Sequence, residues 1–320
     1  MSDFLAQMAA GSRERLAEAR RSCSEAALLQ RAHSLPAAPR LTASPARFDL
    51  IAELKLRSPA VGQLKSGDED IAGRVTSYAR AGAAAVSVLT EPSRFDGSMA
   101  HLESATKSLA PLNVPAMRKD FLVDPYQVIE ARVAGAGGVL VIIRMLPRAG
   151  IEEMLDCAAK LGLFVLLEAF DEADIEVMHE VLGAVDARTA GAQTADASVL
   201  DSRSAEKAPV LAGLNCRDLA TLQIVPTRLI ELAHLLPAHV PRVAESGVVS
   251  AQDAARVAGA GYEFALVGSA LMQGGDPHAL AAAMLKAGRE SARGGNAGGD
   301  GVRGDAGRDS ARRDTGRGDK

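Results

Sequence analysis

The chain has 320 residues, of which 48% are hydrophobic and 24% are charged, and its formal net charge is −4. This profile is typical of a globular protein that buries its own core. With no tryptophan, 3% aromatic residues and a negative charge, the sequence excludes the basic, aromatic surfaces typical of nucleic-acid binding, and no apolar run is long enough to span a membrane.

The first 48 residues have the pattern of amphipathic helices. Leu5, Met8 and Leu16 mark an apolar face between charged residues, and the prolines at positions 36, 39 and 45 end any helix. The first residues also lack the apolar stretch of a signal peptide. We expect residues 1–48 to form an N-terminal helical extension that packs on a larger domain.

Residues 49–290 alternate between short apolar runs and amphipathic helical stretches. The expected strands are residues 50–54, 85–89, 114–117, 139–143, 163–167, 210–214, 240–244 and 264–267. The clearest expected helices are residues 70–80, 125–134, 150–161, 227–236 and 251–259. Nearly continuous apolar strands are typical of a parallel sheet that is buried on both faces. Eight β/α units in about 240 residues predict an α/β fold of the (β/α)8 TIM-barrel type. A doubly wound open sheet is the alternative, but the sequence lacks its glycine-rich nucleotide loop.

Two segments do not fit the repeating pattern. Residues 184–209 are rich in Ala, Thr, Ser, Asp and Gln and have no hydrophobic periodicity, so we expect a flexible surface insertion there. Residues 291–320 are rich in Gly, Arg and Asp and contain one large apolar residue, Val302. Such a segment cannot bury a core, and we expect a disordered tail.

Charged and amide side chains stand at the carboxyl ends of five of the expected strands. They are Glu53 and Lys55, Lys119, Glu168, Asn215 and Arg217, and Glu245. In a TIM barrel the chemistry takes place at this end. Side chains alternate along a strand, so Glu53 and Lys55 can both point into the barrel. Because buried Lys and Glu are costly unless they are paired, we expect one site with opposed charges for proton transfer.

The loops after the last two strands have the composition of a phosphate site. Ser246 and Gly247 follow the seventh expected strand, and Gly268 and Ser269 follow the eighth. These loops bind phosphate in many TIM barrels through backbone N–H groups, and small residues permit close approach. Ser58, in the first loop, can add a further donor.

The cysteines and histidines give no sign of metal chemistry. Cys23, Cys157 and Cys216 form no CxxC pair, which argues against a zinc site and a disulfide framework and favours a reducing cytoplasm. No histidine lies at the end of an expected strand. Cys216 lies beside Asn215, and without a histidine we interpret it as a packing residue.

Seven motifs together resemble one family, the indole-3-glycerol-phosphate synthases. They occur in the family's order and are IAELKLRSPAVG, SVLTEPSRFDGS, PAMRKDFLVDPYQV, LLEAF, GLNCRDLATL, VAESGV and ALVGSALM. RKDF followed by DPYQ is highly specific, and the resemblance covers about residues 1–290. The family's N-terminal helical extension also matches residues 1–48.

The resemblance implies a carboxy-lyase of tryptophan biosynthesis that uses no metal or organic cofactor. Its substrate is 1-(o-carboxyphenylamino)-1-deoxyribulose 5-phosphate, which is cyclised, decarboxylated and dehydrated to indole-3-glycerol phosphate. By this match Lys119 is the general acid of ring closure, and Glu168 handles the proton at dehydration. Lys55 pairs with the anthranilate carboxylate and can share the acid role, while Glu53 and Asn215 hold the reacting centre. The match leaves open which lysine serves which step.

The remaining implied contacts surround the substrate. They are apolar walls around the aryl ring from Phe95, Phe121, Leu140 and Leu266, a phosphate cradle from Ser58, Ser246, Gly247, Gly268 and Ser269, and buttressing side chains from Glu245 and Arg217. We expect this small phosphorylated molecule to be the partner, and the protein to be a monomer or only weakly associated.

Two departures from the family pattern leave an alternative. Ala60 stands where members often have a serine, and Cys216 stands where a second asparagine is common. A catalytically weak paralogue that binds the ligand in a regulatory role is therefore the alternative. Phosphoribosylanthranilate isomerase chemistry fits less well, because it requires a Cys and an Asp on the first and fifth strands, where this chain has Glu53, Lys55 and Glu168.

Overall fold

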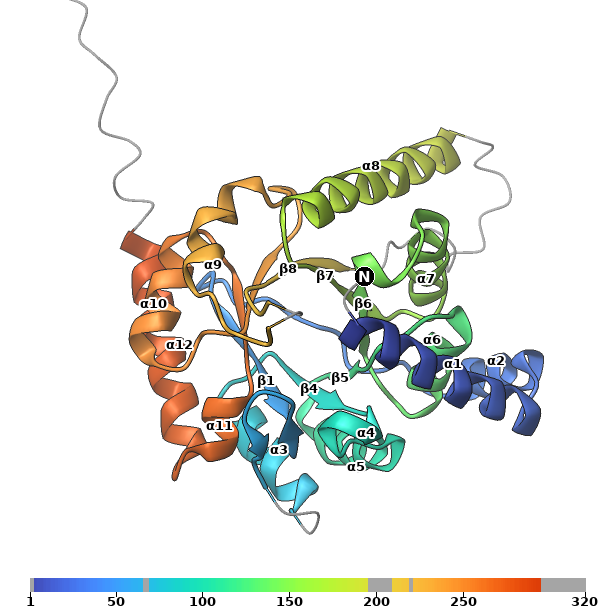
Figure 1. Ribbon diagram of the computed structural model, residues 1–320, viewed down its shortest axis with the longest axis horizontal. Coiled ribbons are helices and arrows are strands. Elements are labelled where there is room, and N and C mark those ends of the chain that lie inside the picture. The colour runs from blue at the N-terminus through green and yellow to red at the C-terminus, as the bar shows by residue number, and fades with distance from the viewer. Residues whose placement is uncertain (1–2, 66–68, 195–208, 219–220, 295–320) are drawn as a thin grey trace, which may run out of the picture.

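The computed structural model describes residues 3–65, 69–194, 209–218 and 221–294, with the backbone alone for residues 186–194 and 294. Eight parallel strands close into a barrel in the order β1-β10-β9-β8-β7-β6-β5-β4 (Figure 1). The strands are β1 (Asp49–Leu54), β4 (Ala85–Leu89), β5 (Ala116–Lys119), β6 (Gly138–Ile142), β7 (Phe164–Ala169), β8 (Val210–Asn215), β9 (Arg242–Glu245) and β10 (Phe264–Val267). This confirms the predicted (β/α)8 barrel.

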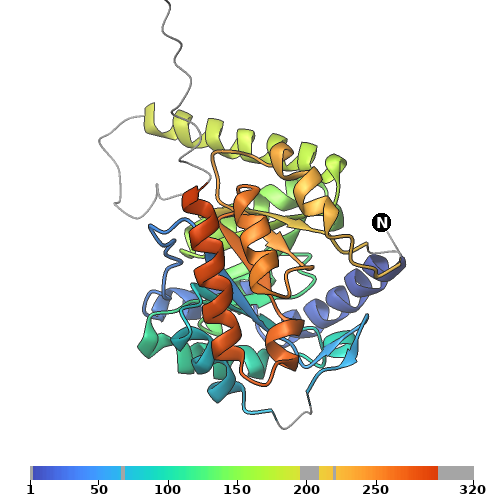
Figure 2. The ribbon, with the colours of Figure 1, turned by 90° about the vertical axis from the view of Figure 1, so that its left-hand side faces the viewer.

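Helices follow the strands and cover the outside of the barrel. They are α3 (Ile71–Arg80), α4 (Pro92–Phe95), α5 (Met99–Leu109), α6 (Pro125–Val133), α7 (Arg148–Lys160), α8 (Glu172–Thr194), α9 (Thr227–Glu231), α10 (Ala251–Gly259), α11 (Ser269–Gln273) and α12 (Pro277–Gly294). Three short 3-10 helices are η1 (Ala110–Leu112), η2 (Ile143–Met145) and η3 (Ala233–Leu235). Figures 1 and 2 show α10 and α12 side by side on one flank. A small hairpin of β2 (Arg57–Ser58) and β3 (Gly62–Gln63) lies in the loop after β1.

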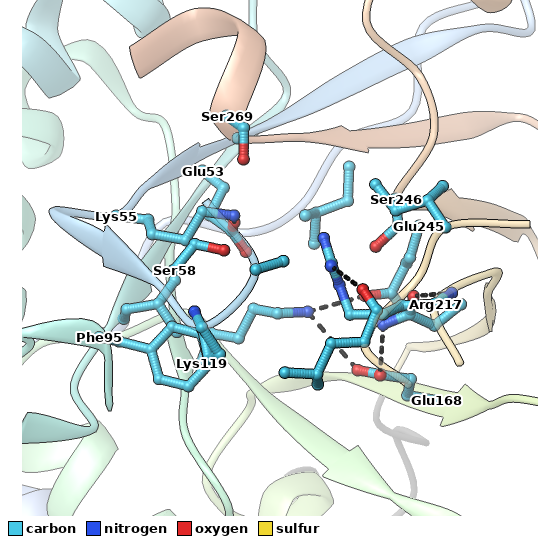
Figure 3. Close-up of a pocket in the computed structure, with 18 of the residues that line it drawn as sticks. Glu53, Lys55, Ser58, Phe95, Lys119, Glu168, Arg217, Glu245, Ser246 and Ser269 are labelled. Atoms are coloured by element: carbon cyan, nitrogen blue, oxygen red, sulfur yellow. Dashed lines mark hydrogen bonds and ion pairs between the residues drawn. The ribbon is translucent and has the colours of Figure 1, made fainter. Parts of the chain in front are cut away.

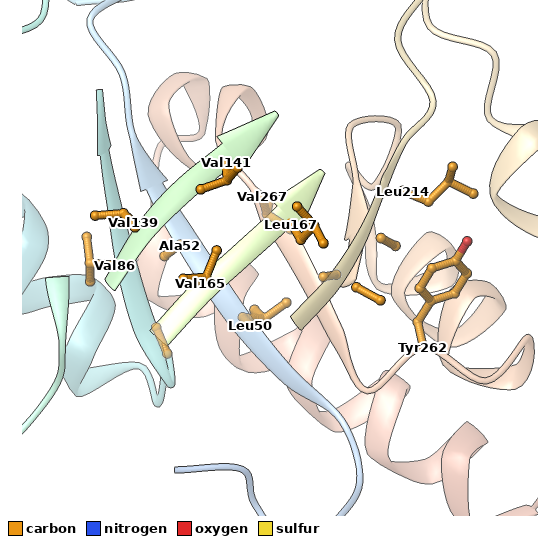
Figure 4. Close-up of a cluster of buried hydrophobic side chains, with 14 of the residues drawn as sticks. Leu50, Ala52, Val86, Val139, Val141, Val165, Leu167, Leu214, Tyr262 and Val267 are labelled. Atoms are coloured by element: carbon orange, nitrogen blue, oxygen red, sulfur yellow. The ribbon is translucent and has the colours of Figure 1, made fainter. Parts of the chain in front are cut away.

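Alternate residues of each strand point to opposite faces, as the period of a β-strand requires. Leu50 and Ala52 belong to the apolar layer between the strands and the helices (Figure 4), whereas Ile51 belongs to the cluster inside the barrel. Glu53 continues the inward series of Ile51. The expected inward position of Glu53 and Lys55 thus agrees with the alternation in β1.

Two helices precede the barrel, α1 (Asp3–Ser22) and α2 (Glu25–Ser34). Leu5, Met8 and Ala9 of α1 are buried in the same cluster as the residues inside the barrel, and α2 packs beside α6 (Figure 1). Ser24 caps α2 by accepting a hydrogen bond from the N–H of Ala27. The extension therefore reaches the open end of the barrel rather than only its outer surface.

Several elements differ in their bounds from the sequence-based expectation, and the helix expected at residues 227–236 is instead α9 followed by η3. The third strand was expected at residues 114–117 but is Ala116–Lys119, because the buried Arg118 is paired with Asp120 and Glu130 and so fits within a strand. The expected insertion begins inside α8, which extends to Thr194, and residues 195–208 lie outside the described residues. Likewise α12 includes residues 291–294 of the expected tail, and residues 295–320 lie outside the described residues. Among the helices described, none is both long and apolar enough to cross a membrane.

Candidate active site

A pocket opens at the carboxyl ends of the barrel strands (Figure 3). All of the site residues predicted from the sequence line it. They are Glu53, Lys55, Ser58, Phe95, Lys119, Phe121, Leu140, Glu168, Asn215, Arg217, Glu245, Ser246, Gly247, Leu266, Gly268 and Ser269. The strand register explains this convergence, because Asn215 pairs with Glu245, and Lys119 pairs with Leu89 at the end of the neighbouring strand.

Lys119 lies at the centre of the charged part of the pocket. Its Nζ atom is 2.7 Å from Oε2 of Glu245 and 3.5 Å from Oε2 of Glu168. Both carboxylates are almost completely buried, with side chains 1% and 4% exposed. A charged lysine is tolerated in such surroundings because it donates hydrogen bonds to two carboxyl groups.

The carboxylate of Glu168 is held in place by an amide. Asn215 Nδ2 donates a hydrogen bond of 2.8 Å to Oε1 of Glu168, and the backbone N–H of Arg217 donates to Oδ1 of Asn215. The second contact fixes which way the amide points, so the Asn215 nitrogen must face Glu168. The two oxygens of Glu168 therefore have different partners, Asn215 and Lys119.

A second lysine–carboxylate pair comes from β1 and the residue just beyond it. Lys55 Nζ lies 2.6 Å from Oε1 of Glu53. Gly268 leaves room for this pair, because a β-carbon at position 268 would lie 2.3 Å from Oε1 of Glu53 and 3.0 Å from Nζ of Lys55. The pocket thus holds two lysines in different surroundings, one between two carboxylates and one beside a single carboxylate.

The charges of the pocket move the pKa values of three groups. Burial opposes ionisation of Glu53, but Lys55, Lys119 and Arg217 outweigh it and lower the pKa of this carboxyl. Burial likewise opposes the charge on Lys119, but Glu245, Glu168 and Glu53 outweigh it and raise its pKa well above the ordinary value. Burial and the nearby Glu168 raise the pKa of Glu245 to about 8, although Lys119 acts in the opposite direction. Glu245 therefore ionises with more difficulty than an unperturbed glutamate.

One oxygen of Glu245 has no partner. Its Oε1 atom is buried and accepts no hydrogen bond from the described residues, while Oε2 faces Lys119. Buried polar atoms are nearly always hydrogen-bonded, and exceptions cluster at functional sites. Burial of an oxygen without a partner adds to the cost of ionising this carboxyl.

Small residues and hydroxyl groups form another side of the pocket. Ser246 and Gly247 both have positive φ angles, 66° and 70°, a conformation that costs free energy in a non-glycine residue such as Ser246. Ser269 opens α11, directly after β10, and Ser58 is buried in the β2–β3 hairpin. This composition suits a phosphate group, which accepts hydrogen bonds from hydroxyl and backbone N–H groups.

Cys216 lies beneath this side and is fully buried. A β-carbon on Gly247 would lie 3.0 Å from its Sγ atom. Burial raises the pKa of the Cys216 thiol to about 11, so it is protonated at neutral pH and is a poor nucleophile. The structure is consistent with the packing role expected for Cys216.

The apolar side of the pocket is built around Phe121. The ring of Phe95 lies 6.0 Å from that of Phe121, and the ring of Phe4 meets it edge-on at 5.9 Å. Leu140 and Leu266 belong to the same cluster. A flat aromatic ligand can be held between such side chains.

Several pocket residues were not predicted from the sequence. They include Phe4 and Leu5 of α1, Ile142 at the end of β6, Phe170 after β7, and Ile224, Val248 and Val249 in the later loops. These are apolar, so no residue type marks them as part of a site, whereas Asp120, which also lines the pocket, is a buried carboxylate directly after β5. For Phe4 and Leu5, the helical pattern indicates that one face of α1 is buried, but it does not indicate which end of the barrel this face packs against.

Comparison with known protein families gives one clear match. The sequence profile of the family described as indole-3-glycerol phosphate synthase matches residues 5–188 and 194–284. An indole-3-glycerol phosphate synthase of Parafrankia sp. (strain EAN1pec) is 39% identical over 286 residues, which cover 88% of this chain and 95% of that protein. One of Leifsonia xyli subsp. xyli (strain CTCB07) is 38% identical over 274 residues, covering 84% and 94%.

Solved structures of other enzymes share the barrel. A 3-hexulose-6-phosphate synthase from Salmonella typhimurium superposes with a TM-score of 0.53 at 14% identity, covering 76% of this chain and all of that one. A thiamine phosphate pyrophosphorylase from Pyrococcus furiosus gives a TM-score of 0.50 at 14% identity, covering 77% and 98%. At such low identity these structures bear on the fold alone.

Proposed function

Because the chain belongs to the indole-3-glycerol phosphate synthase family, we propose that it catalyses the formation of indole-3-glycerol phosphate in tryptophan biosynthesis. The substrate is 1-(o-carboxyphenylamino)-1-deoxyribulose 5-phosphate, and the enzyme is a carbon–carbon lyase of the carboxy-lyase class. The observation that carries this proposal is Lys119, held between Glu168 and Glu245 in a pocket with an apolar side and a side of serines and glycines.

The pocket is suited to both ends of this substrate. The apolar side around Phe95 and Phe121 can hold the aryl ring. The serines and glycines of the loops after β9 and β10 can hold the phosphate. A substrate bound in this way places its ribulose carbonyl between the two ends, where Lys119 lies.

Ring closure requires a proton donor at the carbonyl oxygen. An aryl carbon attacks the carbonyl carbon, the carbonyl oxygen takes up a proton, and loss of CO2 then restores the aromatic ring. Lys119 supplies the positive charge and the proton for this step. Its carboxylate neighbours raise the pKa of Lys119, which keeps it charged at neutral pH but makes it a weaker acid, so its proton moves only as negative charge develops on the carbonyl oxygen.

Lys55 and Glu168 act at the other reacting groups. Lys55 pairs with the anthranilate carboxylate until that group leaves as CO2, and it can also donate a proton. Glu168, which Asn215 holds in place, takes up the proton lost from the carbon next to the one that carries the new hydroxyl, and Lys55 donates the proton with which that hydroxyl leaves as water. Glu53 orients Lys55 through their ion pair, and Glu245 and Arg217 buttress the site.

The proposal extends to the organisation of the whole chain. We propose that residues 1–48 and the barrel of residues 49–290 form one catalytic unit, because Phe4 and Leu5 of α1 line the pocket. We also propose a cytoplasmic protein that is a monomer or weakly associated. The three cysteines are all unpaired, which supports a reducing compartment.

Identification of the product tests the function. Purified protein is incubated with the substrate, the products are separated, and their molecular masses are measured by mass spectrometry. We expect the loss of one CO2 and one water per molecule of substrate, and a product with indole absorption. Failure of the wild-type protein to form this product would overturn the proposal, and product binding without turnover would instead support the weak paralogue.

A further inference from the structure

Arg144 joins two neighbouring loops at the catalytic end of the barrel. It lies in η2, directly after β6. Its Nε atom donates a hydrogen bond of 2.8 Å to Oδ2 of Asp174, and its Nη2 atom donates one of 2.6 Å to Oδ2 of Asp171. Asp171 and Asp174 both belong to the segment after β7, at the start of α8. A guanidinium group that bonds two carboxylates in this way has a fixed position.

The same guanidinium group lies over the ring of Phe170. The distance from Cζ of Arg144 to the ring centroid is 4.7 Å, within the range of a cation–π contact. Asp174 also accepts a hydrogen bond of 2.8 Å from the backbone N–H of Phe170. Arg144 and Asp174 therefore hold both the ring and the backbone of Phe170.

Phe170 forms part of the pocket wall. It is 3% exposed, lines the pocket, and belongs to the same buried cluster as Phe121 and Leu140. It follows Glu168 by two residues in the chain. Arg144 itself does not line the pocket, so any effect it has on a bound molecule must pass through Phe170 and its loop.

We infer that Arg144 is a positioning residue that keeps Phe170 in place as a preformed wall of the apolar side of the pocket. The inference rests on the proposed function for the identity of the bound molecule. When a binding-competent arrangement is only partly populated, the affinity for the ligand falls by the same fraction. Loss of Arg144 allows Phe170 to leave its position, so the aryl group of substrate or product binds less tightly.

This role predicts a defined kinetic signature. Arg144 touches neither the lysines nor the carboxylates that transfer protons, so the chemical step is unchanged once the substrate is bound. Arg144→Met keeps an unbranched side chain but removes the cation. We expect this change to raise KM by roughly threefold to thirtyfold, the effect of a lost cation–π contact. The Kd of the product should rise by a similar factor. We expect kcat to stay within about twofold of wild type.

The product provides a direct binding probe. The chain contains no tryptophan, so the indole fluorescence of indole-3-glycerol phosphate can be titrated with almost no background from the protein. A matched control is Arg148→Met, since Arg148 also pairs with two carboxylates, Glu152 and Glu180, but is largely exposed and lies outside the pocket. We expect this control to leave KM, kcat and the product Kd unchanged.

A double-mutant cycle separates positioning from a general loss of stability. In a Phe170→Leu background the Arg144→Met change should raise KM and the product Kd by much less than in the wild type, because the ring it positions is gone. Arg144→Lys keeps a charge without the planar stacking group and should lie between wild type and Arg144→Met. It also provides a measurement if Arg144→Met fails to fold.

The outcomes are distinct. An Arg144→Met enzyme with the KM and product Kd of the Arg148→Met control would overturn the inference, and so would a fall in kcat at constant KM. Full additivity with Phe170→Leu would overturn it as well. A wild-type protein that neither binds the product nor turns over the substrate would instead overturn the proposed function.

Discussion

Gly213 leaves the space that the carboxylate of Glu245 occupies. A β-carbon on Gly213 would lie 2.4 Å from Oε1 of Glu245 and 2.9 Å from Cδ1 of Leu166. Gly213 is in β8, beside the strand that carries Glu245, so the absence of a side chain in one strand determines where a charged group of the next strand can lie. Through Glu245 it also determines the surroundings of Lys119.

Gly213→Ala should therefore impair catalysis without removing any ionisable group. The methyl group displaces Glu245 from Lys119, and a misplacement of about 1 Å in an active site can cost about a hundredfold in rate. We expect kcat/KM to fall by tenfold to about a hundredfold, as measured in a steady-state assay. Gly183→Ala is the control, because a β-carbon at position 183 of α8 would meet nothing within 4 Å. Equal activity of the two variants would contradict this account of Gly213.

The raised pKa of Glu245 predicts how stability depends on pH. Its folded-state pKa is raised to about 8, whereas an unperturbed glutamate titrates near 4.3. Between these values the folded protein holds a proton that the unfolded chain has released, so the stability contribution of Glu245 is present at low pH and is lost as the pH rises toward 8.

Glu245→Gln removes this titration while keeping a neutral group of the same shape. The Tm of the wild type should therefore fall relative to the Tm of Glu245→Gln as the pH rises from about 5 to 8. Thermal unfolding of both proteins across this range provides the measurement. A Tm difference that is constant over the range would show that Glu245 ionises normally in the folded protein.

The N-terminal extension should contribute to substrate binding through Phe4. The ring of Phe4 meets Phe121 edge-on and lines the pocket. Phe4→Ala removes this contact, and an aromatic pair contributes about 0.5–1.5 kcal/mol beyond its buried area. We expect KM to rise severalfold while kcat changes little.

Glu14→Ala, on the exposed side of the same helix, is the control for Phe4→Ala and should behave as wild type. If Phe4→Ala also behaves as wild type, α1 stabilises the barrel without taking part in the site, and the extension and the barrel are not one catalytic unit.

Arg289 should stabilise the fold without affecting the site. It joins α12 to the start of β1, donating hydrogen bonds of 3.0 Å to the carbonyl of Phe48 and 2.7 Å to Oδ1 of Asp49. Asp49 is 2% exposed, so Arg289→Met leaves a buried carboxylate short of a partner. We expect Tm to fall by several degrees, consistent with a loss of about 1–3 kcal/mol, with unchanged KM. A change in KM with unchanged Tm would contradict this.

The barrel and its charged site could be predicted because both depend on local patterns. Alternation along β1 places Glu53 and Lys55 on one face, and the carboxyl ends of parallel strands meet at one end of a barrel. Lys119, Glu168 and Glu245 each follow an apolar run, so their convergence follows from the fold. The strand at residues 116–119 was placed two residues early, because the charged Arg118 resembles the start of a loop until its partners Asp120 and Glu130 are known.

What the sequence could not reveal are relationships between distant segments. The amphipathic pattern of α1 predicts that one of its faces is buried, but it does not predict that Phe4 contacts Phe121. Arg144 resembles any surface arginine until it is seen over the ring of Phe170. Which carboxylate pairs with Lys119 also depends on side-chain geometry at the pocket rather than on spacing in the chain.

The central claim is that Lys119 is the general acid of ring closure. Removal of this side chain is the most direct test. Wild type and Lys119→Ala are mixed with 1-(o-carboxyphenylamino)-1-deoxyribulose 5-phosphate, and the rise of indole fluorescence is followed in a protein that has no tryptophan of its own. Circular dichroism confirms that both are folded. We predict product formation by the wild type and a loss of at least about a hundredfold in kcat for Lys119→Ala, the scale of general acid catalysis. Full activity of folded Lys119→Ala would contradict the account.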